Sequence, residues 1–160
     1  MKRTGLFLTF ALLALLAPAA AAVKPLKEPL PPLEDAVYPA GLICPFPLLE
    51  EVLVNRGKSI TFSDGSQLVT GTLKERLTNL DTGESIVVNI SGPGTFTVEG
   101  DVLHVFGRGA WLLLAVEGEP GGPGALLIHG HIRFDVDLLT NLPSNLQVRG
   151  TMRDLCETLG

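Results

Sequence analysis

Turn signals at nearly regular intervals constrain this chain more than any other feature. Clusters of glycine, aspartate, asparagine and proline recur about every 17 to 21 residues through its second half. Between them, apolar and polar residues alternate, most regularly over residues 125–138. A period of two places successive side chains on opposite faces of a strand, so the pattern predicts half-buried strands joined by tight turns. The turns are predicted at Asp64-Gly65, Asp81-Thr82-Gly83, Glu99-Gly100-Asp101, Gly118 to Gly124 and Asn141-Leu142-Pro143.

Several of these strands carry glycine in the middle of their apolar face. A missing side chain there lets a strand bend and a sheet coil toward closure. We therefore predict an all-β fold, an antiparallel up-and-down meander that closes into a small barrel, with a short C-terminal helix within residues 152–159. The alternative is a two-sheet β-sandwich, in which the glycines mark where strands cross between sheets. The glycines are Gly71, Gly92, Gly94, Gly107 and Gly130, and the aromatic residues predicted to fill the barrel are Phe96, Phe106, Trp111 and Phe134.

The first residues resemble an export signal. Residues 1–22 contain a basic start, an apolar run and a small-residue cleavage site at Ala20-Ala21-Ala22. Residues 23–43 are rich in proline and predict an extended lead-in, and residues 44–160 form one domain. No later stretch reaches the roughly 20 apolar residues of a membrane helix, so no membrane span is predicted. We expect a secreted, extracellular protein.

Two cysteines support this interpretation. Cys44 and Cys156 are the only cysteines of the chain. An even number in an exported protein predicts a disulfide, so we expect these two to be bonded to each other. A metal thiolate or a catalytic thiol would need further ligands or a base, and neither cysteine has a neighbouring histidine in the sequence.

The charge balance argues against nucleic acid as a partner. The formal net charge is -5, whereas proteins that bind phosphate backbones carry clustered lysine and arginine. The glycine pairs lack the motif of a phosphate-binding loop, and no nucleophile elbow of a serine hydrolase occurs. For sugar-binding platforms the chain offers only Trp111 and Tyr38, and Trp111 is predicted to lie in the core. No cofactor is predicted.

The histidines suggest one candidate metal site. His129 and His131 stand two residues apart on a predicted strand, so their rings point the same way and lie about 7 Å apart. His104, on another strand, is the candidate third ligand of a site with an open position. The alternative is a solvated strand face without a metal. Asp135, Asp137 and Glu75 are the carboxylates nominated for acid or base chemistry.

A resemblance adds context. The stretches from Gly71 to Gly83 and on to Gly94 resemble uncharacterised small secreted β proteins of actinobacteria. The resemblance spans residues 44–150 and implies an exported β fold without an established activity. We therefore predict a non-enzymatic binding or structural module, with a small apolar ligand or a cell-envelope component as partner. The alternative is a barrel-type enzyme or a metal-binding protein that uses the histidine-lined face.

Overall fold

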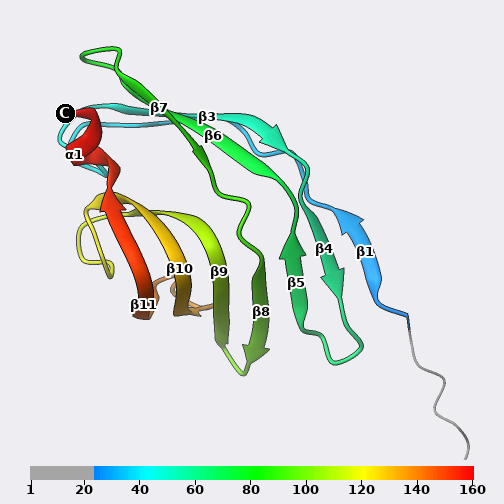
Figure 1. The fold of residues 1–160 in the computed structure, drawn as a ribbon. Coiled ribbons are helices and arrows are strands. Elements are labelled where there is room, and N and C mark those ends of the chain that lie inside the picture. The colour runs from blue at the N-terminus through cyan, green and yellow to red at the C-terminus, as the bar shows by residue number, and fades with distance from the viewer. Residues whose placement is uncertain (1–23) are drawn as a thin grey trace, which may run out of the picture.

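The fold consists of two antiparallel sheets and one short C-terminal helix, shown in Figure 1. The computed structural model describes residues 24–160, so the signal peptide predicted for residues 1–22 lies outside the described residues. The strands are β1 (Leu26–Pro29), β2 (Ala36–Tyr38), β3 (Leu48–Asn55), β4 (Lys58–Thr61), β5 (Gln67–Thr70), β6 (Leu73–Asn79), β7 (Ser85–Asn89), β8 (Gly94–Glu99), β9 (Val102–Ala115), β10 (Gly124–Asp137) and β11 (Pro143–Asp154), followed by the helix α1 (Leu155–Leu159).

The predicted meander is present, but four of its strands are divided between the sheets. The seven-stranded sheet has the order β1-β4-β5-β8-β9-β10-β11, and the four-stranded sheet has the order β2-β3-β6-β7. The pairs β1/β2, β3/β4, β5/β6 and β7/β8 are therefore four long strands, each of which pairs in one sheet and then in the other. In Figure 1 the second sheet folds over one end of the first.

The barrel prediction is not supported, and the sandwich alternative fits. Among residues 24–160, β1 pairs only with β4 and β11 only with β10, so the seven-stranded sheet keeps two free edges. The sheet stays open because the first four long strands bend away into the four-stranded sheet instead of coiling toward β11.

Gly71 marks one of the crossings between the sheets, as the sandwich alternative predicts. It lies between β5 and β6 with φ at 143°, a backbone conformation that residues with a side chain rarely adopt. A Cβ at this position would overlap the backbone carbonyl of Arg56, which belongs to the neighbouring crossing from β3 to β4. The backbone N–H of Arg56 also donates to the carbonyl of Thr72 at 2.8 Å. The two crossings therefore lie side by side and depend on a glycine.

Three other glycines make room for one side chain. A Cβ at Gly94 would lie 2.6 Å from Cζ2 of Trp111, and a Cβ at Gly92 would lie 2.7 Å from its indole nitrogen. Gly107 faces the same indole, and a Cβ there would overlap it. Trp111 thus lies in a notch lined by Gly92, Gly94 and Gly107, which explains these glycines more directly than strand bending does.

The main core lies between the two sheets and the C-terminal helix. The four-stranded sheet contributes Leu48 and Leu77, and α1 contributes Leu155 and Leu159, all fully or almost fully buried. The facing surface is one end of β9 and β10, so residues 124–128 are buried on both faces. Residues 110–116 have apolar side chains on both faces in the sequence, a pattern that predicts the most covered strand there. The correction follows from the second sheet, which covers one face of residues 124–128.

The disulfide prediction is confirmed. Cys44 and Cys156 are bonded, with their Cα atoms 5.3 Å apart and a sequence separation of 112 residues. Asp154 caps α1 by accepting a hydrogen bond from the backbone N–H of Cys156 at 2.8 Å. The bond therefore joins the segment before β3 to the terminal helix, beside the core.

The proline-rich lead-in contributes two short edge strands. β1 pairs with β4, and β2 pairs with β3, so the lead-in predicted to be extended is ordered along the edges of both sheets. Pro29 is tolerated because β1 lies at the edge of the sheet, where proline need not donate to a second neighbour.

Candidate functional site

One face of the long strands changes from buried to polar along its length. Ala125 and Leu127 of β10 pack in the core, whereas His129, His131 and Arg133, on the same face, are exposed. The four-stranded sheet covers only the first part of this face, as Figure 1 shows. The alternation predicted over residues 125–138 is therefore confirmed for its exposed half. We call the uncovered part, formed by β8 to β11, the outer face.

Strand pairing determines which side chains are neighbours on the outer face. Phe106 of β9 lies opposite Arg133 of β10, which in turn lies opposite Gln147 of β11. In the next row, His131 lies between Arg108 of β9 and Arg149 of β11. The second row thus adds two more arginines beside the first.

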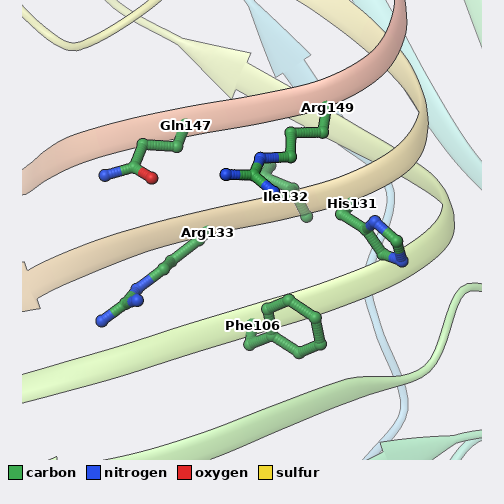
Figure 2. Close-up of a pocket in the computed structure, with 6 residues that line it drawn as sticks. All are labelled: Phe106, His131, Ile132, Arg133, Gln147 and Arg149. Atoms are coloured by element: carbon green, nitrogen blue, oxygen red, sulfur yellow. The ribbon is translucent and has the colours of Figure 1, made fainter.

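These rows surround a shallow hollow of about 340 Å³, which we call the basic hollow. Figure 2 shows its side chains, which come from three neighbouring strands. Its lining residues are Phe106, His131, Ile132, Arg133, Gln147 and Arg149. Two guanidinium groups, an imidazole and an amide offer many hydrogen-bond donors around one space. Such a set suits an anion with oxygen acceptors.

The arginines of this region form no direct ion pair among the described residues, although the charge of Arg133 helps to lower the pKa of Asp135. The ion pairs among residues 24–160 involve Arg76 and His104 as the cationic partners, and none involves Arg108, Arg133 or Arg149. The chain as a whole is acidic, with a net charge of -5. Three unpaired arginines on neighbouring strands of an acidic protein form a local positive surface, which attracts anions.

Phe106 forms an aromatic platform at the centre of this surface. Its side chain is 41% exposed, although the sequence predicted that it fills the interior. The His131 ring stacks on it with centroids 5.9 Å apart, and the guanidinium carbon of Arg108 lies 5.9 Å from the ring centroid. These contacts hold cationic or titratable groups around an exposed apolar ring.

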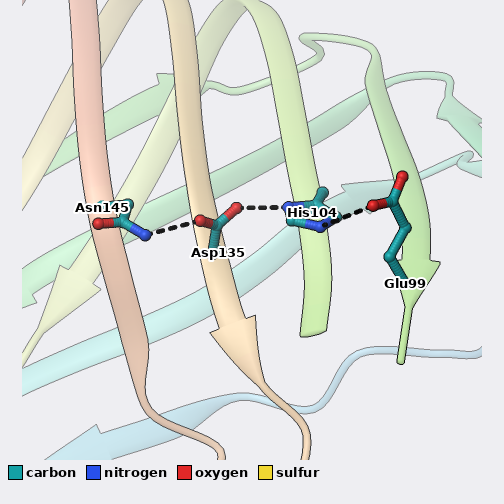
Figure 3. Close-up of polar contacts among 4 residues, drawn as sticks. All are labelled: Glu99, His104, Asp135 and Asn145. Carbon is teal, nitrogen blue, oxygen red and sulfur yellow. Dashed lines mark hydrogen bonds and ion pairs between the residues drawn. The ribbon is translucent and has the colours of Figure 1, made fainter. Parts of the chain in front are cut away.

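A second polar row crosses the same strands nearer their turns, as Figure 3 shows. Nδ1 of His104 lies 2.7 Å from Oδ1 of Asp135, and the Asn145 amide donates to Oδ2 of Asp135 at 2.8 Å. Nε2 of His104 lies 3.9 Å from the exposed carboxylate of Glu99. The hydrogen bond from Asn145, followed by the one with His104, lowers the pKa of Asp135 below its ordinary value. Asp135 is thus held ionised between two fixed partners.

The position of Asn145 depends on an irregularity in the pairing. The register of β10 and β11 shifts between Arg133 and Asp135. Asn145 has a φ of 55°, in the left-handed region that asparagine tolerates better than most residues. A shift of this kind redirects a side chain at a strand end. Here it accompanies the contact between the Asn145 amide and Asp135.

A smaller hollow of about 190 Å³ adjoins this second row, and we call it the polar hollow. It shares Phe106 and Arg133 with the basic hollow, so the two lie side by side, and we call them together the groove. Its remaining lining residues are Thr95, Thr97, His104 and Val105. Arg149 and His131 thus line only the basic hollow, the two threonines and His104 line only the polar hollow, and Arg133 lies between them.

The structure does not bring the three predicted metal-binding histidines together. His104 lies opposite Asp135, which is four residues beyond His131 and thus about 13 Å farther along β10. His131 instead stacks on Phe106, and His129 lies opposite Ala110. Across residues 24–160, no group of three or more histidine, cysteine, aspartate or glutamate side chains is arranged to hold a metal ion. Sequence spacing could not show this, because it depends on the register between strands.

The three carboxylates predicted for acid or base chemistry do not form one site either. Asp137 accepts hydrogen bonds from the backbone N–H groups of Leu139 and Thr140, both at 2.9 Å, and these bonds lower its pKa. Glu75 is buried on the four-stranded sheet, away from the outer face. Only Asp135 belongs to the candidate site.

Two further hollows occur elsewhere in the described part of the chain. One of about 400 Å³ lies beside the disulfide and is lined mainly by the segment 41–46 and by α1. The other, of about 200 Å³, lies near the crossings and includes Leu73, Ile90, Phe96 and Trp111. Neither contains a cluster of unpaired charges like that of the basic hollow.

Sequence reasoning missed the residues that form the basic hollow. Arg133 was recognised only as part of a solvated face, and Arg108, Gln147 and Arg149 were not singled out. The available signal was the two-residue spacing along each strand, because residues two apart lie on the same face. Arg108 and Phe106 share a face of β9, as His131 and Arg133 share one of β10. An antiparallel hairpin with its turn near residues 116–123 brings these faces together.

Comparison with known proteins gives no relative. No family model, no curated protein and no solved structure matches the chain. The resemblance to actinobacterial secreted proteins therefore stays a prediction. Within residues 24–160, no helix has the length and apolar character needed to cross a membrane.

Proposed function

We propose that this chain is an exported, non-enzymatic binding module whose outer face holds an anionic ligand. The observation that carries the proposal is the basic hollow, where Arg133 and Arg149 line one space and lack ion-pair partners in the described structure. Arg108 adds a third guanidinium beside it. Arginine binds carboxylate and phosphate groups through two parallel hydrogen bonds, which provides both strength and orientation.

Export is supported by the disulfide and by the leader-like residues 1–22. Disulfides persist in oxidising compartments. The bond between Cys44 and Cys156 ties residues near the two ends of the predicted domain. The ligand is therefore expected outside the cytoplasm, and of the two predicted partners the charged hollow favours a cell-envelope component over a small apolar molecule.

The experiment that tests the proposal is calorimetric titration with two carboxylate oligomers of equal charge, hexaglutamate and hexagalacturonate. At least one of them should bind at about 50 mM salt, and the affinity should fall as salt is raised, because exposed charges are screened. Arg133→Gln and Arg149→Gln should each weaken binding about tenfold to a hundredfold, the effect of losing a hydrogen bond to a charged group.

Arg153→Gln is the matched control. Arg153 lies on the same strand as Arg149, is exposed, and does not line the basic hollow. Its replacement removes the same charge and should leave affinity within about twofold. Absence of binding to both oligomers, or an equal loss in Arg153→Gln and Arg149→Gln, would overturn the proposal. Consumption of either oligomer would favour the enzyme alternative.

A further inference from the structure

The basic hollow and the polar hollow together form one groove with unlike ends. Phe106 and Arg133 belong to both hollows, so a single ligand can contact both spaces. Arg149 and His131 lie at one end, and His104 lines the other. The two ends make different chemical demands on a ligand.

The polar end disfavours a dense polyanion. Asp135 is ionised and 18% exposed, and the carboxylate of Glu99 lies at the outer end of the same row. Like charges placed opposite each other in a complex weaken binding strongly. A ligand with an anionic group on every unit of a short, compact repeat would bring negative charge against these carboxylates. The ligand should therefore present neutral polar groups to this end and its anionic groups to the arginines.

The same end is well supplied for hydroxyl groups. His104 lines the polar hollow, and the nitrogens of an imidazole ring donate or accept hydrogen bonds with hydroxyl groups. Thr97 and Thr95 line the polar hollow, and each hydroxyl both donates and accepts. A ligand with several hydroxyl groups can satisfy these side chains without adding charge.

Phe106 supplies an apolar surface between the ends. Its ring is exposed at the point where the two hollows meet. The C–H face of a pyranose ring is flat and apolar, and packing it against an aromatic ring removes both surfaces from water. Ligand sites commonly combine such an apolar surface with a few fixed polar groups.

We infer that the ligand of this groove is an acidic carbohydrate, a chain of sugar units that carry carboxylates. The inference rests on the proposed function and narrows its ligand class. Carboxylates of the carbohydrate bind Arg133 and Arg149, a sugar ring packs on Phe106, and hydroxyls contact Thr97 and His104. The sequence offered only Trp111 and Tyr38 as sugar platforms, and the exposed ring of Phe106 replaces them.

The test compares three probes on the intact domain. Hexagalacturonate has the rings, hydroxyls and carboxylates. Its fully methyl-esterified form keeps the rings and hydroxyls but has no charge, and hexaglutamate keeps only the carboxylates. Wild type should bind hexagalacturonate at least tenfold more tightly than either of the others. Equal affinity for hexaglutamate would overturn the carbohydrate inference and leave the proposed function intact.

Two variants separate the ends of the groove. Thr97→Val removes one hydroxyl at nearly constant shape, and Phe106→Leu removes the flat ring from an exposed position. Each should weaken hexagalacturonate about fivefold or more and leave any binding of hexaglutamate within twofold, whereas Arg149→Gln should weaken both. Thr151→Val, an exposed change on β11 outside both hollows, is the control. Unchanged hexagalacturonate affinity in both Thr97→Val and Phe106→Leu would overturn the inference, and absence of binding to every probe would remove the proposed function as well.

Discussion

Replacing Glu75 with glutamine should remove most of the pH dependence of the free energy of unfolding. Glu75 is 4% exposed on β6, and its Oε2 atom has no hydrogen-bond partner among the described residues. Glu50 lies beside it and accepts a hydrogen bond from the Tyr38 hydroxyl at 2.8 Å. Burial, then the charge of Glu50 and a hydrogen bond with it, raises the pKa of Glu75 to about 8. The folded chain therefore holds a proton at pH values where an unfolded chain does not.

The magnitude follows from the two pKa values. The ordinary pKa of the carboxyl is 4.5, and in the folded protein it is about 8. Between these values, the free energy of unfolding falls by about 1.4 kcal/mol for each unit that pH rises, because the unfolded chain has lost the proton and the folded chain has kept it. Below pH 4.5 both states are protonated, and above pH 8 both are ionised, so the dependence vanishes. The full difference is at most on the order of 5 kcal/mol, a large share of the roughly 5 to 15 kcal/mol that holds a domain folded.

The assay is urea denaturation of wild type and Glu75→Gln at pH 5, 6.5 and 8. Glutamine keeps the shape and a donor but does not ionise, so the variant should match wild type within about 1 kcal/mol at pH 5 and exceed it by about 2 kcal/mol or more at pH 8. Glu51→Gln is the control, since Glu51 lies on β3 next to Glu50, is partly exposed and pairs with Arg76 at 3.4 Å. Parallel pH profiles for wild type and Glu75→Gln would refute the reasoning.

Two further changes test the core and the disulfide. Cys156→Ser opens a loop of 112 residues, and the chain-entropy model predicts a loss of about 4 to 5 kcal/mol in the free energy of unfolding. The melting temperature in non-reducing buffer should therefore fall markedly. An unchanged melting temperature would contradict a stabilising role of the disulfide. Gly107→Ala places a Cβ against the Trp111 indole, so denaturation should show a loss of about 1 to 3 kcal/mol. Adding Trp111→Phe should recover part of that loss, and no recovery would argue against the steric cause.

The sequence predicted what depends on local pattern. Turns at Asp64-Gly65 and Asp81-Thr82-Gly83 and the alternation around His131 reflect backbone conformations that a few neighbouring residues determine. The Cys44–Cys156 bond followed from counting cysteines. These features need no knowledge of how distant segments meet.

What escaped prediction depends on distant segments. Gly71 permits a sharp change of strand direction. Whether the strand then closes a barrel or enters a second sheet depends on the distant residues 124–128, whose apolar face the second sheet buries. His104 failed to join His131 because the register of β9 and β10 sets it opposite Asp135. The basic hollow needs Arg149 beside His131, and that neighbour comes from β11, after a register shift.

The division of four strands between two sheets affects how the molecule responds to load. In a sandwich whose layers are joined only by loops, one layer can shear against the other while the loops yield. Here continuous backbone passes from layer to layer at each of four crossings, and two of these, near Arg56 and Gly71, are locked against each other. At the opposite side, the bond between Cys44 and Cys156 fastens α1 to the start of the second layer. The outer face is therefore connected to both sheets through continuous backbone and the disulfide. A force applied to it is shared by the whole domain.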